Sequence, residues 1–433
     1  MLLDFSVENF GPFRDRVTLS MQATSIKKHD ENVIDCSPAG MNLVSSALVF
    51  GPNASGKSYL FKAICALRSM VDDTFPDGKK YRWYEPFRFD SRFVESPVAF
   101  QIRFCEEGTI YDYSISFLSD RVVSERLAYH PIKRARLVFE RKESIEDFKG
   151  KNKRLLRLLT PTSSFLALGS KYNDELCSKV RGMIRGLITL DSEDVGSLSL
   201  RSCKFVEKDD RMRRMMIEGL QKADFGITGY DIIDNSLDID AAKRILPPAT
   251  YDAVFPDGRT SVNLHSISVR HRFGRLAGDE GVEASFDMYD EESVGTRYMF
   301  GIMGPLVDCL INGKTIFIDE FGSHLHPLLT RWLVEQFSKG NNPHGAQMVA
   351  MTHDVGLMDT RDLVRRDQIF LIDKNKDDGS SSLYCLSDFK NARKDDEILR
   401  AYLLGRYDAI PLVSYKGVMD VEEDRESFFE QPY

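Results

Sequence analysis

The sequence has few of the features that mark secreted, membrane or metal-binding proteins. Its seven cysteines are scattered over 433 residues without a CxxC pair, so we expect reduced thiols that serve as small core residues. The opening MLLDFSVENF carries two acids and no basic segment, unlike a signal peptide. The most apolar stretch, Tyr298–Ile311, contains Pro305 and Asp308 and is too short to span a bilayer. These absences predict a soluble, cytoplasmic protein with no membrane partner.

Excess positive charge is also missing. With 58 basic and 66 acidic residues the net charge is -8, which argues against a protein that coats nucleic acid by bulk electrostatics. A local basic groove is still compatible with that total. No internal repeat and no heptad run long enough for a coiled-coil arm is present. The length predicts two lobes, or one composite unit that carries an insertion.

Hydrophobic alternation predicts strands near the N-terminus. Leu2–Val7 and Val17–Met21 alternate on either side of the turn Asn9–Pro12, and residues 98–118 form a second predicted hairpin. Between the hairpins, an apolar strand at Ala47–Phe50 precedes a helical pattern over Tyr59–Val71.

The remaining chain predicts an α/β protein with an insertion. Residues 133–225 are rich in Lys and Arg and mainly helical in pattern, followed by predicted strands at Ile227–Ile233 and Ser261–Phe273. The last third alternates strand and helix, which is typical of a mostly parallel sheet; its segments are Thr315–Ile318, Leu328–Phe337, Gln347–Met351 and Ile369–Ile372. We therefore expect an N-terminal lobe (1–132), a helical insertion (133–225) and a C-terminal lobe (226–433), with a mixed sheet and an N-terminal β-subdomain.

The segment Gly51–Ser58 reads GPNASGKS and matches the P-loop pattern GxxxxGK[ST]. Glycines let such a loop wrap so that backbone N–H groups face phosphates, and the helix that follows presents its positive end to the same anions. Lys57 is predicted to reach the β- and γ-phosphates and Ser58 to offer its hydroxyl to magnesium. The predicted ligands are ATP and Mg²⁺, and the contacting residues are Asn53, Ala54, Ser55, Gly56, Lys57 and Ser58.

An acidic motif lies about 260 residues further along the chain, where the strand KTIFI ends in Asp319 and Glu320. Asp319 suits a magnesium ion that it holds through a bound water. Glu320 suits the general base that polarises the attacking water. A separation this large requires an insertion between the two halves of the nucleotide site.

Two further residue groups complete the predicted site. Ser293 and Gly295, in the segment ESVGT, begin an apolar helix, and a helix start of this kind suits a phosphate. The alternative is that Ser293 is only a helix cap. His353, in the segment MTHD after the next strand, is predicted to contact the γ-phosphate and sense hydrolysis, although a histidine at a strand end is more often structural.

Other features are given a structural interpretation. His324 and His326 match no standard zinc spacing, and His326-Pro327 is predicted to shape the loop into the next helix. The basic runs Lys149–Arg157 and Arg211–Arg214 could contact nucleic acid or an acidic partner, but no aromatic stacking residues accompany them.

The order P-loop, SVGT, IFIDE and THD resembles that of ABC/SMC-type ATPases, and FSVENFGPFRDRVTLSM resembles the first hairpin of Rad50/SMC and OLD-like ATPases. The chain is most similar to the AAA15 family of bacterial ABC-like ATPases, through LVFGPNASGKSYLFKA, IFIDEFGSHLHPLLTRWLVEQF, NPHGAQMVAMTHD and RRDQIFLIDKN. The similarity covers roughly residues 1–120 and 285–412 and is weak between them.

This resemblance implies a slow ATPase that forms a dimer or a higher oligomer. ATP would lie between two protomers, with Lys57 and Ser58 of one facing Ser293 and Gly295 of the other. Relatives of the PARIS and RloB-associated type imply a sensor or scaffold in antiviral defence that controls a toxin or a TOPRIM or RloB-like nuclease, with nucleic acid or a phage protein as trigger. The alternative is a RecF- or Rad50-type DNA-repair ATPase. Two departures are the SVGT signature in place of LSGGQ and the lack of a Q-loop glutamine in Tyr84–Phe89.

Overall fold

Short apolar strands that are buried on both faces build the centre of the molecule. In the computed structural model, which describes residues 1–36, 40–72, 81–131, 134–142, 147–191, 195–238, 261–273, 281–389 and 398–410, six strands pair in the order β11-β15-β16-β5-β17-β18. All neighbours are parallel except β17 and β18. The strands are β5 (Ser46–Phe50), β11 (Ile188–Asp191), β15 (Thr315–Asp319), β16 (Gln347–Met351), β17 (Ile369–Lys374) and β18 (Ser381–Cys385).

A seven-stranded antiparallel sheet forms the N-terminal lobe, in the order β10-β9-β8-β7-β6-β1-β2. Its strands alternate buried and half-exposed residues, as expected for a sheet with one face on a core. They are β1 (Leu2–Glu8), β2 (Val17–Ser20), β6 (Val98–Glu106), β7 (Thr109–Phe117), β8 (Val122–His130), β9 (Arg136–Arg141) and β10 (Lys149–Gly150).

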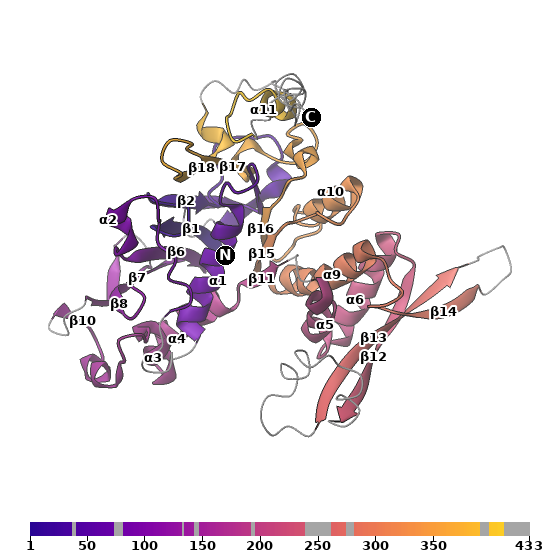
Figure 1. The fold of residues 1–433 in the computed structure, drawn as a ribbon, viewed down its shortest axis with the longest axis horizontal. Helices are drawn as coiled ribbons and strands as arrows, with labels where there is room; N and C mark the ends of the chain where they lie inside the picture. Colours follow the sequence, from indigo (N-terminus) through magenta and orange to yellow (C-terminus); the bar gives the residue numbers. More distant parts are fainter. Residues whose placement is uncertain are drawn as a thin grey trace, which may run out of the picture.

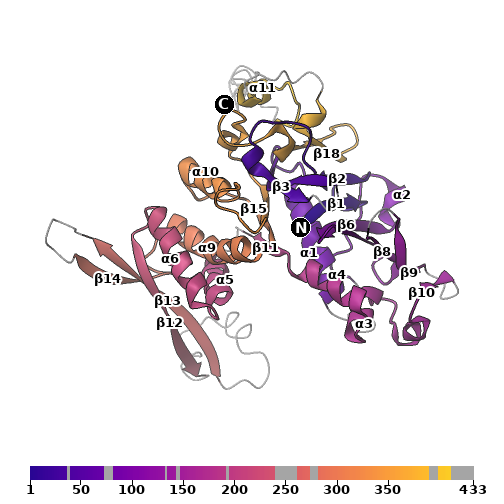
Figure 2. The same cartoon turned by 180° about the vertical axis from the view of Figure 1, so that it is seen from behind.

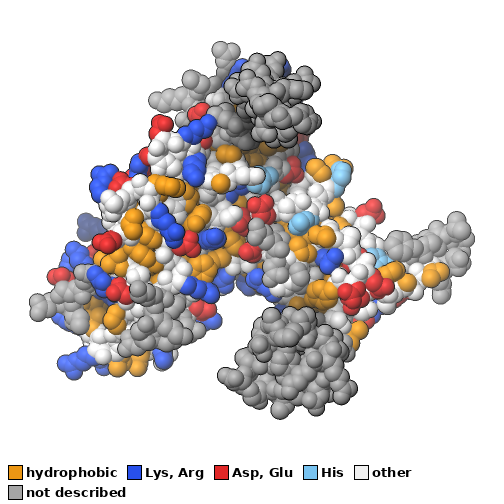
Figure 3. Space-filling view, in the orientation of Figure 1, with side chains coloured by type: hydrophobic (Ala, Val, Ile, Leu, Met, Phe, Trp, Pro, Cys, Tyr) orange, Lys and Arg blue, Asp and Glu red, His pale blue; other side chains and the backbone are white. Residues whose placement is uncertain are grey.

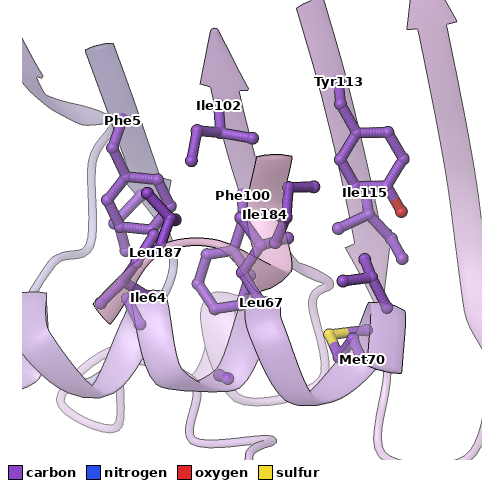
Figure 4. Packing of buried hydrophobic residues seen from close by; sticks show 14 of the residues in the cluster. Phe5, Ile64, Leu67, Met70, Phe100, Ile102, Tyr113, Ile115, Ile184 and Leu187 are labelled. Carbon is purple, nitrogen blue, oxygen red and sulfur yellow. The ribbon is translucent and has the colours of Figure 1, made fainter. Parts of the chain in front are cut away.

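Helix α1 (Lys57–Asp72) lies between these two sheets. Ile64, Leu67 and Met70 pack toward Phe5 and Phe100 of the antiparallel sheet, as Figure 4 shows. The same core includes Phe317 and other residues from the facing side of the central sheet. Of the sixteen residues of α1 only Lys62 is exposed. Packing against both sheets therefore fixes the helix that begins at Lys57.

The opposite side of the central sheet carries a second core. Successive residues of each strand point to opposite faces, so that Ala47 and Val49 of β5 belong to the first core, and Leu48 and Phe50 to the second. Several helices contribute to the second core, among them α5 (Val195–Val206), α6 (Asp210–Lys222), α9 (Val294–Asn312) and α10 (Pro327–Glu335).

A three-stranded antiparallel sheet extends from this second core. It consists of β12 (Ile227–Asp238), β13 (Ser261–Phe273) and β14 (Val282–Asp287), packed beside α5, α6 and α9 and remote from the N-terminal lobe (Figures 1 and 2). The smaller elements are β3 (Val33–Cys36), β4 (Met41–Val44), α2 (Ser91–Val94), α3 (Phe165–Lys171), α4 (Glu175–Arg185) and α11 (Ile398–Leu403).

Most strands predicted from the sequence are confirmed, including both N-terminal hairpins and the strands of the last third. The segment 133–225 contains the expected helices α3 to α6, but it also supplies three strands that were not predicted. β9 and β10 extend the N-terminal sheet, and β11 pairs in parallel with β15 in the central sheet. The residues of this segment are therefore shared among both sheets and the second core. The three-part division itself stays a prediction.

The surface mixes charges of both signs. On the face shown in Figure 3, basic side chains of the N-terminal lobe are interspersed with acidic and apolar ones rather than gathered into one band. No helix within the described ranges is both long and apolar enough to cross a bilayer.

A buried carboxylate holds the N-terminal lobe to α3. Glu125 of β8 is 1% exposed and accepts hydrogen bonds from Arg141 Nε at 2.8 Å and from the Tyr113 hydroxyl at 2.9 Å. It also accepts from the backbone N–H groups of Phe165 and Leu166 at the start of α3, at 2.7 and 2.9 Å. This position satisfies N–H groups that a helix start leaves without partners.

We predict that Glu125→Ala destabilises the protein by about 3–5 kcal/mol, because it leaves the guanidinium of Arg141 buried without its partner. Chemical denaturation followed by circular dichroism measures the change. Glu140→Ala is the matched control: it removes the exposed pair between Glu140 and Lys149 in the same sheet, at a cost of about 0–1 kcal/mol. Equal losses from the two variants would contradict this role of Glu125.

Candidate functional site

The P-loop follows β5 at the carboxyl edge of the central sheet, where parallel strands of α/β proteins leave room for ligands. Backbone conformation explains its sequence. Ala54 has φ 60° and Gly56 has φ 118°, both in the left-handed region. A Cβ on Gly56 would lie 2.8 Å from Pro12 Cγ, and a Cβ on Gly51 would lie 2.5 Å from the Ile372 carbonyl oxygen. Only glycine fits these two positions without displacing its neighbours.

Lys57 is buried at the start of α1. Its ammonium donates hydrogen bonds to the carbonyl oxygens of Gly51 at 2.8 Å and Pro52 at 3.1 Å, within the loop itself. Burial lowers the pKa of Lys57, while the nearby carboxylates of Glu320 and Asp319 act in the opposite direction. The ammonium thus lies inside the loop that the motif predicts to surround the phosphates.

Asp319, at the end of β15, has an unusual environment. The residue is 7% exposed, and burial raises its pKa from 3.8 to about 6; a hydrogen bond from the Ser58 side chain lowers it in part, and the charge of Glu320 adds to the rise. Its Oδ1 atom has no hydrogen-bond partner within the described part of the chain. A buried carboxylate oxygen without a partner, next to the Ser58 hydroxyl, fits the oxygen ligands that Mg²⁺ prefers.

Glu320 and His353 lie next to each other at the adjoining strand ends. His353 Nε2 is 3.9 Å from Glu320 Oε1. Burial lowers the pKa of His353, as does the charge of Lys57, and Glu320 opposes them. The balance favours the neutral imidazole. Glu320 itself adopts a left-handed backbone with φ 50°, a strain that clusters at functional sites.

These side chains share one cavity of about 970 Å³. It is lined by all six P-loop residues predicted from Asn53 to Ser58, and also by Glu320 and His353. Asp319 is not part of the lining but reaches the cavity through Ser58. The cavity is large enough for a nucleotide-sized ligand.

Ser293 and Gly295 do not line this cavity. The Ser293 side chain caps α9 by accepting a hydrogen bond from the Thr296 N–H at 3.1 Å. Gly295 lies close to the loop after β15, where an added Cβ would be 3.1 Å from the His324 carbonyl oxygen. The capping role considered from the sequence is thus present, and contact with a nucleotide stays a prediction.

Several residues that line the cavity of about 970 Å³ do not belong to a recognisable sequence motif. They come from the turn after β1, from α1, from the segment before α2 and from β17: Gly11, Pro12, Tyr59, Glu85, Pro86, Arg88, Phe89 and Lys374. The segment Tyr84–Phe89, in which no glutamine was found, does reach the cavity, through Glu85 and Phe89 among others. A neighbouring cavity of about 1050 Å³, which extends along residues 373–379, shares Asn53, Phe89, His353 and Lys374 with the first.

The remaining histidines of the predicted site region have structural roles. The side chain of His326 accepts a hydrogen bond from the Leu328 N–H at 3.2 Å and caps α10, with Pro327 in the first turn, which confirms the interpretation of His326-Pro327. His324 packs against the ring of Tyr298. In the ranges that the structure describes, no group of three His, Cys, Asp or Glu side chains could hold a metal ion.

We predict that Asp319→Asn stabilises the ligand-free protein at pH 7.5 by about 1–3 kcal/mol. The unfolded carboxyl titrates near 3.8 and the folded one at about 6, so the native state binds more protons in this window and stability falls as pH rises through it. Chemical denaturation in EDTA measures the difference.

The gain should shrink toward pH 4, where the folded carboxyl is already protonated. Added Mg²⁺ with ATP should stabilise the Asp319→Asn variant less than the native protein. A destabilised Asp319→Asn variant at pH 7.5 would contradict the assigned environment.

No curated protein matches the chain. Among solved structures, the SMC head domain from Thermotoga maritima aligns at 12% identity and TM-score 0.39, over 89% of this chain and 98% of that one. An SmcHead bound to the C-winged helix domain of ScpA aligns at 11% identity and TM-score 0.44, over 89% and 99%.

The decisive match is to a family model described as "AAA domain, putative AbiEii toxin, Type IV TA system". It covers residues 46–175 and 224–359, more than half of the chain. These two segments contain the P-loop, Ser293 and Gly295, Asp319 and Glu320, and His353. The chain therefore belongs to this family of AAA domains, with the mixed α/β fold described above.

Proposed function

We propose that the chain binds ATP with magnesium and hydrolyses it in a site that two copies complete together. The observation that carries this proposal is the division of the predicted residues. Lys57, Ser58, Glu320 and His353 meet at one cavity, whereas Ser293 and Gly295 lie outside it. A second copy would supply the missing helix start from across an interface.

Each residue at the cavity has a role that follows from its position. The backbone of the P-loop would surround the β- and γ-phosphates, and Lys57 would exchange its two carbonyl partners for phosphate oxygens. Magnesium, held by Ser58 and through water by Asp319, would neutralise charge on the phosphates. Glu320 would orient and deprotonate the attacking water. His353, neutral and 3.9 Å from Glu320, would contact the γ-phosphate.

The start of α9 supplies the chemistry expected of the second copy. Ser293 carries a hydroxyl, and the first turn of α9 has backbone N–H groups directed along the helix axis toward its start. Helix α9 is also bonded to the loop just after Glu320. The hydroxyl of Tyr298 in α9 accepts a hydrogen bond from the N–H of Gly322 in that loop, at 3.2 Å. A phosphate bound at Ser293 would therefore affect the position of the loop that follows the general base.

The cellular role we propose is control of a partner effector in a defence system of the toxin–antitoxin class. The description of the matched family supports it. In this proposal the chain is a sensor or scaffold, its nucleotide state governs a toxin or a TOPRIM or RloB-like nuclease, and a nucleic acid or phage protein is the trigger.

We predict that Lys57→Ala abolishes ATP binding, whereas Glu320→Gln keeps binding and lowers hydrolysis by about 10²–10⁴-fold. Equilibrium binding of labelled ATP and release of phosphate measure the two steps. Glu320→Gln should also accumulate the ATP-bound oligomer in size-exclusion chromatography, and this form should retain the effector in co-purification. Native turnover by Glu320→Gln would show that another group acts as the base.

A mixing experiment tests whether the site is shared. Ser293→Asp keeps the helix cap, because Asp caps as well as Ser, but places a negative charge where the phosphate would bind. We predict that Ser293→Asp and Lys57→Ala are each inactive, and that an equimolar mixture recovers about a quarter of native turnover, since half of the dimers are mixed and each has one intact site.

Ser293→Thr, which keeps both hydroxyl and cap, is the active control. A mixture that stays inactive although its subunits exchange would contradict a shared site.

A further inference from the structure

A further cavity lies at the opposite edge of the central sheet from the P-loop. It has a volume of about 620 Å³ and is bounded by the loop after β2, the segment before β17 and the first residue of α11. The short helix Arg366–Gln368 leads directly into β17, so this cavity is at the amino edge of the strands. Half of its lining is basic, in a chain of net charge -8: Lys27, Lys28, His29, Arg365 and Arg366.

A buried ion pair holds the walls of this cavity in place. Arg365 is 1% exposed and donates from Nε and Nη2 to both carboxylate oxygens of Asp367, each at 2.8 Å. Its guanidinium also donates to the carbonyl oxygens of Lys28 at 3.1 Å and Thr24 at 3.2 Å. Asp367 in turn accepts from the N–H and the hydroxyl of Thr24, both at 2.7 Å. The loop that bears the lysines is therefore fixed to the segment before β17.

Among the residues that the structure describes, the charges at the mouth of the cavity are not balanced. In the described ranges neither Lys27 nor Lys28 has a carboxylate partner, and both are exposed. Two acids in the described part of this loop are engaged or peripheral: Glu31 pairs with His29 at 2.9 Å, and Asp30 lies 3.8 Å from Arg365 with its side chain 78% exposed. Two ammonium groups on a fixed loop suit the oxygens of a phosphate.

The rest of the lining is largely apolar. Ile26, Val364 and Ile398 contribute to the wall, and Val364 and Ile398 are buried. Cavities of this size with an apolar wall and a few charged groups are typical of sites for small organic ligands. A ligand that matches both parts carries a phosphate at one end and an uncharged group at the other.

We propose that this cavity binds a phosphorylated small molecule of nucleotide size, independently of ATP in the P-loop. Lys27 and Lys28 hold the phosphate, the apolar wall receives the uncharged group, and Arg365 with Asp367 position the lysine loop. The segment that contains Arg365 continues into β17, and β17 pairs with β5. The ligand and the P-loop are therefore attached to the same sheet at its two opposite edges.

Calorimetric titration with AMP tests the proposal, using the full chain with Lys57→Ala so that the P-loop does not contribute. We expect one site per chain, weaker binding of inorganic pyrophosphate, which lacks the apolar group, and no binding of adenosine. Adding Lys27→Glu and Lys28→Glu should raise the Kd for AMP by roughly tenfold or more.

The matched control is Lys151→Glu with Lys153→Glu, which changes the net charge equally at exposed lysines of the segment 133–225 and should leave the Kd unchanged. Lys27→Gln with Lys28→Gln should give an intermediate loss of affinity for AMP. This result distinguishes the loss of electrostatic attraction to the phosphate from misfolding. Absence of AMP binding to the Lys57→Ala chain, or equal losses in the two charge-reversed proteins, would overturn the proposal.

Discussion

The placement of α1 between two sheets is the constraint on which the rest of the structure depends. A helix covered on both sides cannot shift without opening its packing against each sheet, and it begins at Lys57. The antiparallel sheet therefore fixes the orientation of the helix whose first turn faces the cavity. The same arrangement explains the composition of α1, which lacks the continuous polar face of a surface helix.

Much of this fold follows from sequence patterns. Two of the strands that the sequence does not predict, β10 and β11, escape prediction for the same physical reason. Strands such as β1, β6 and β15 are recognisable by alternation or by a continuous apolar run. β10 has two residues and β11 has four, too few to establish a period, and they become strands only through pairing with distant partners. Tertiary context thus overrides the helical character of the flanking sequence.

In the candidate site, too, some features follow from local sequence patterns and others depend on the tertiary structure. The P-loop and the acidic pair are local patterns, so the sequence predicts them by residue. The raised pKa of Asp319 is not local, since it depends on burial beneath the loop and, in part, on Asp191, which β11 brings beside it in register. The proposed phosphate contact of Ser293 has no local signature of its own, because a helix cap and an interface contact have the same local sequence.

The turn at Gly11 and Pro12 shows why motif boundaries and structural boundaries differ. Pro12 lies against Gly56, its carbonyl oxygen accepts a hydrogen bond from the Ser381 N–H at 2.7 Å, and both turn residues line the cavity. The family match nevertheless begins at residue 46. A module cut at that boundary would keep the P-loop and the acidic pair and lose one wall of the candidate site. Replacing the N-terminal hairpin by that of a related protein would therefore change the ligand affinity, although each of these sequence motifs would stay the same.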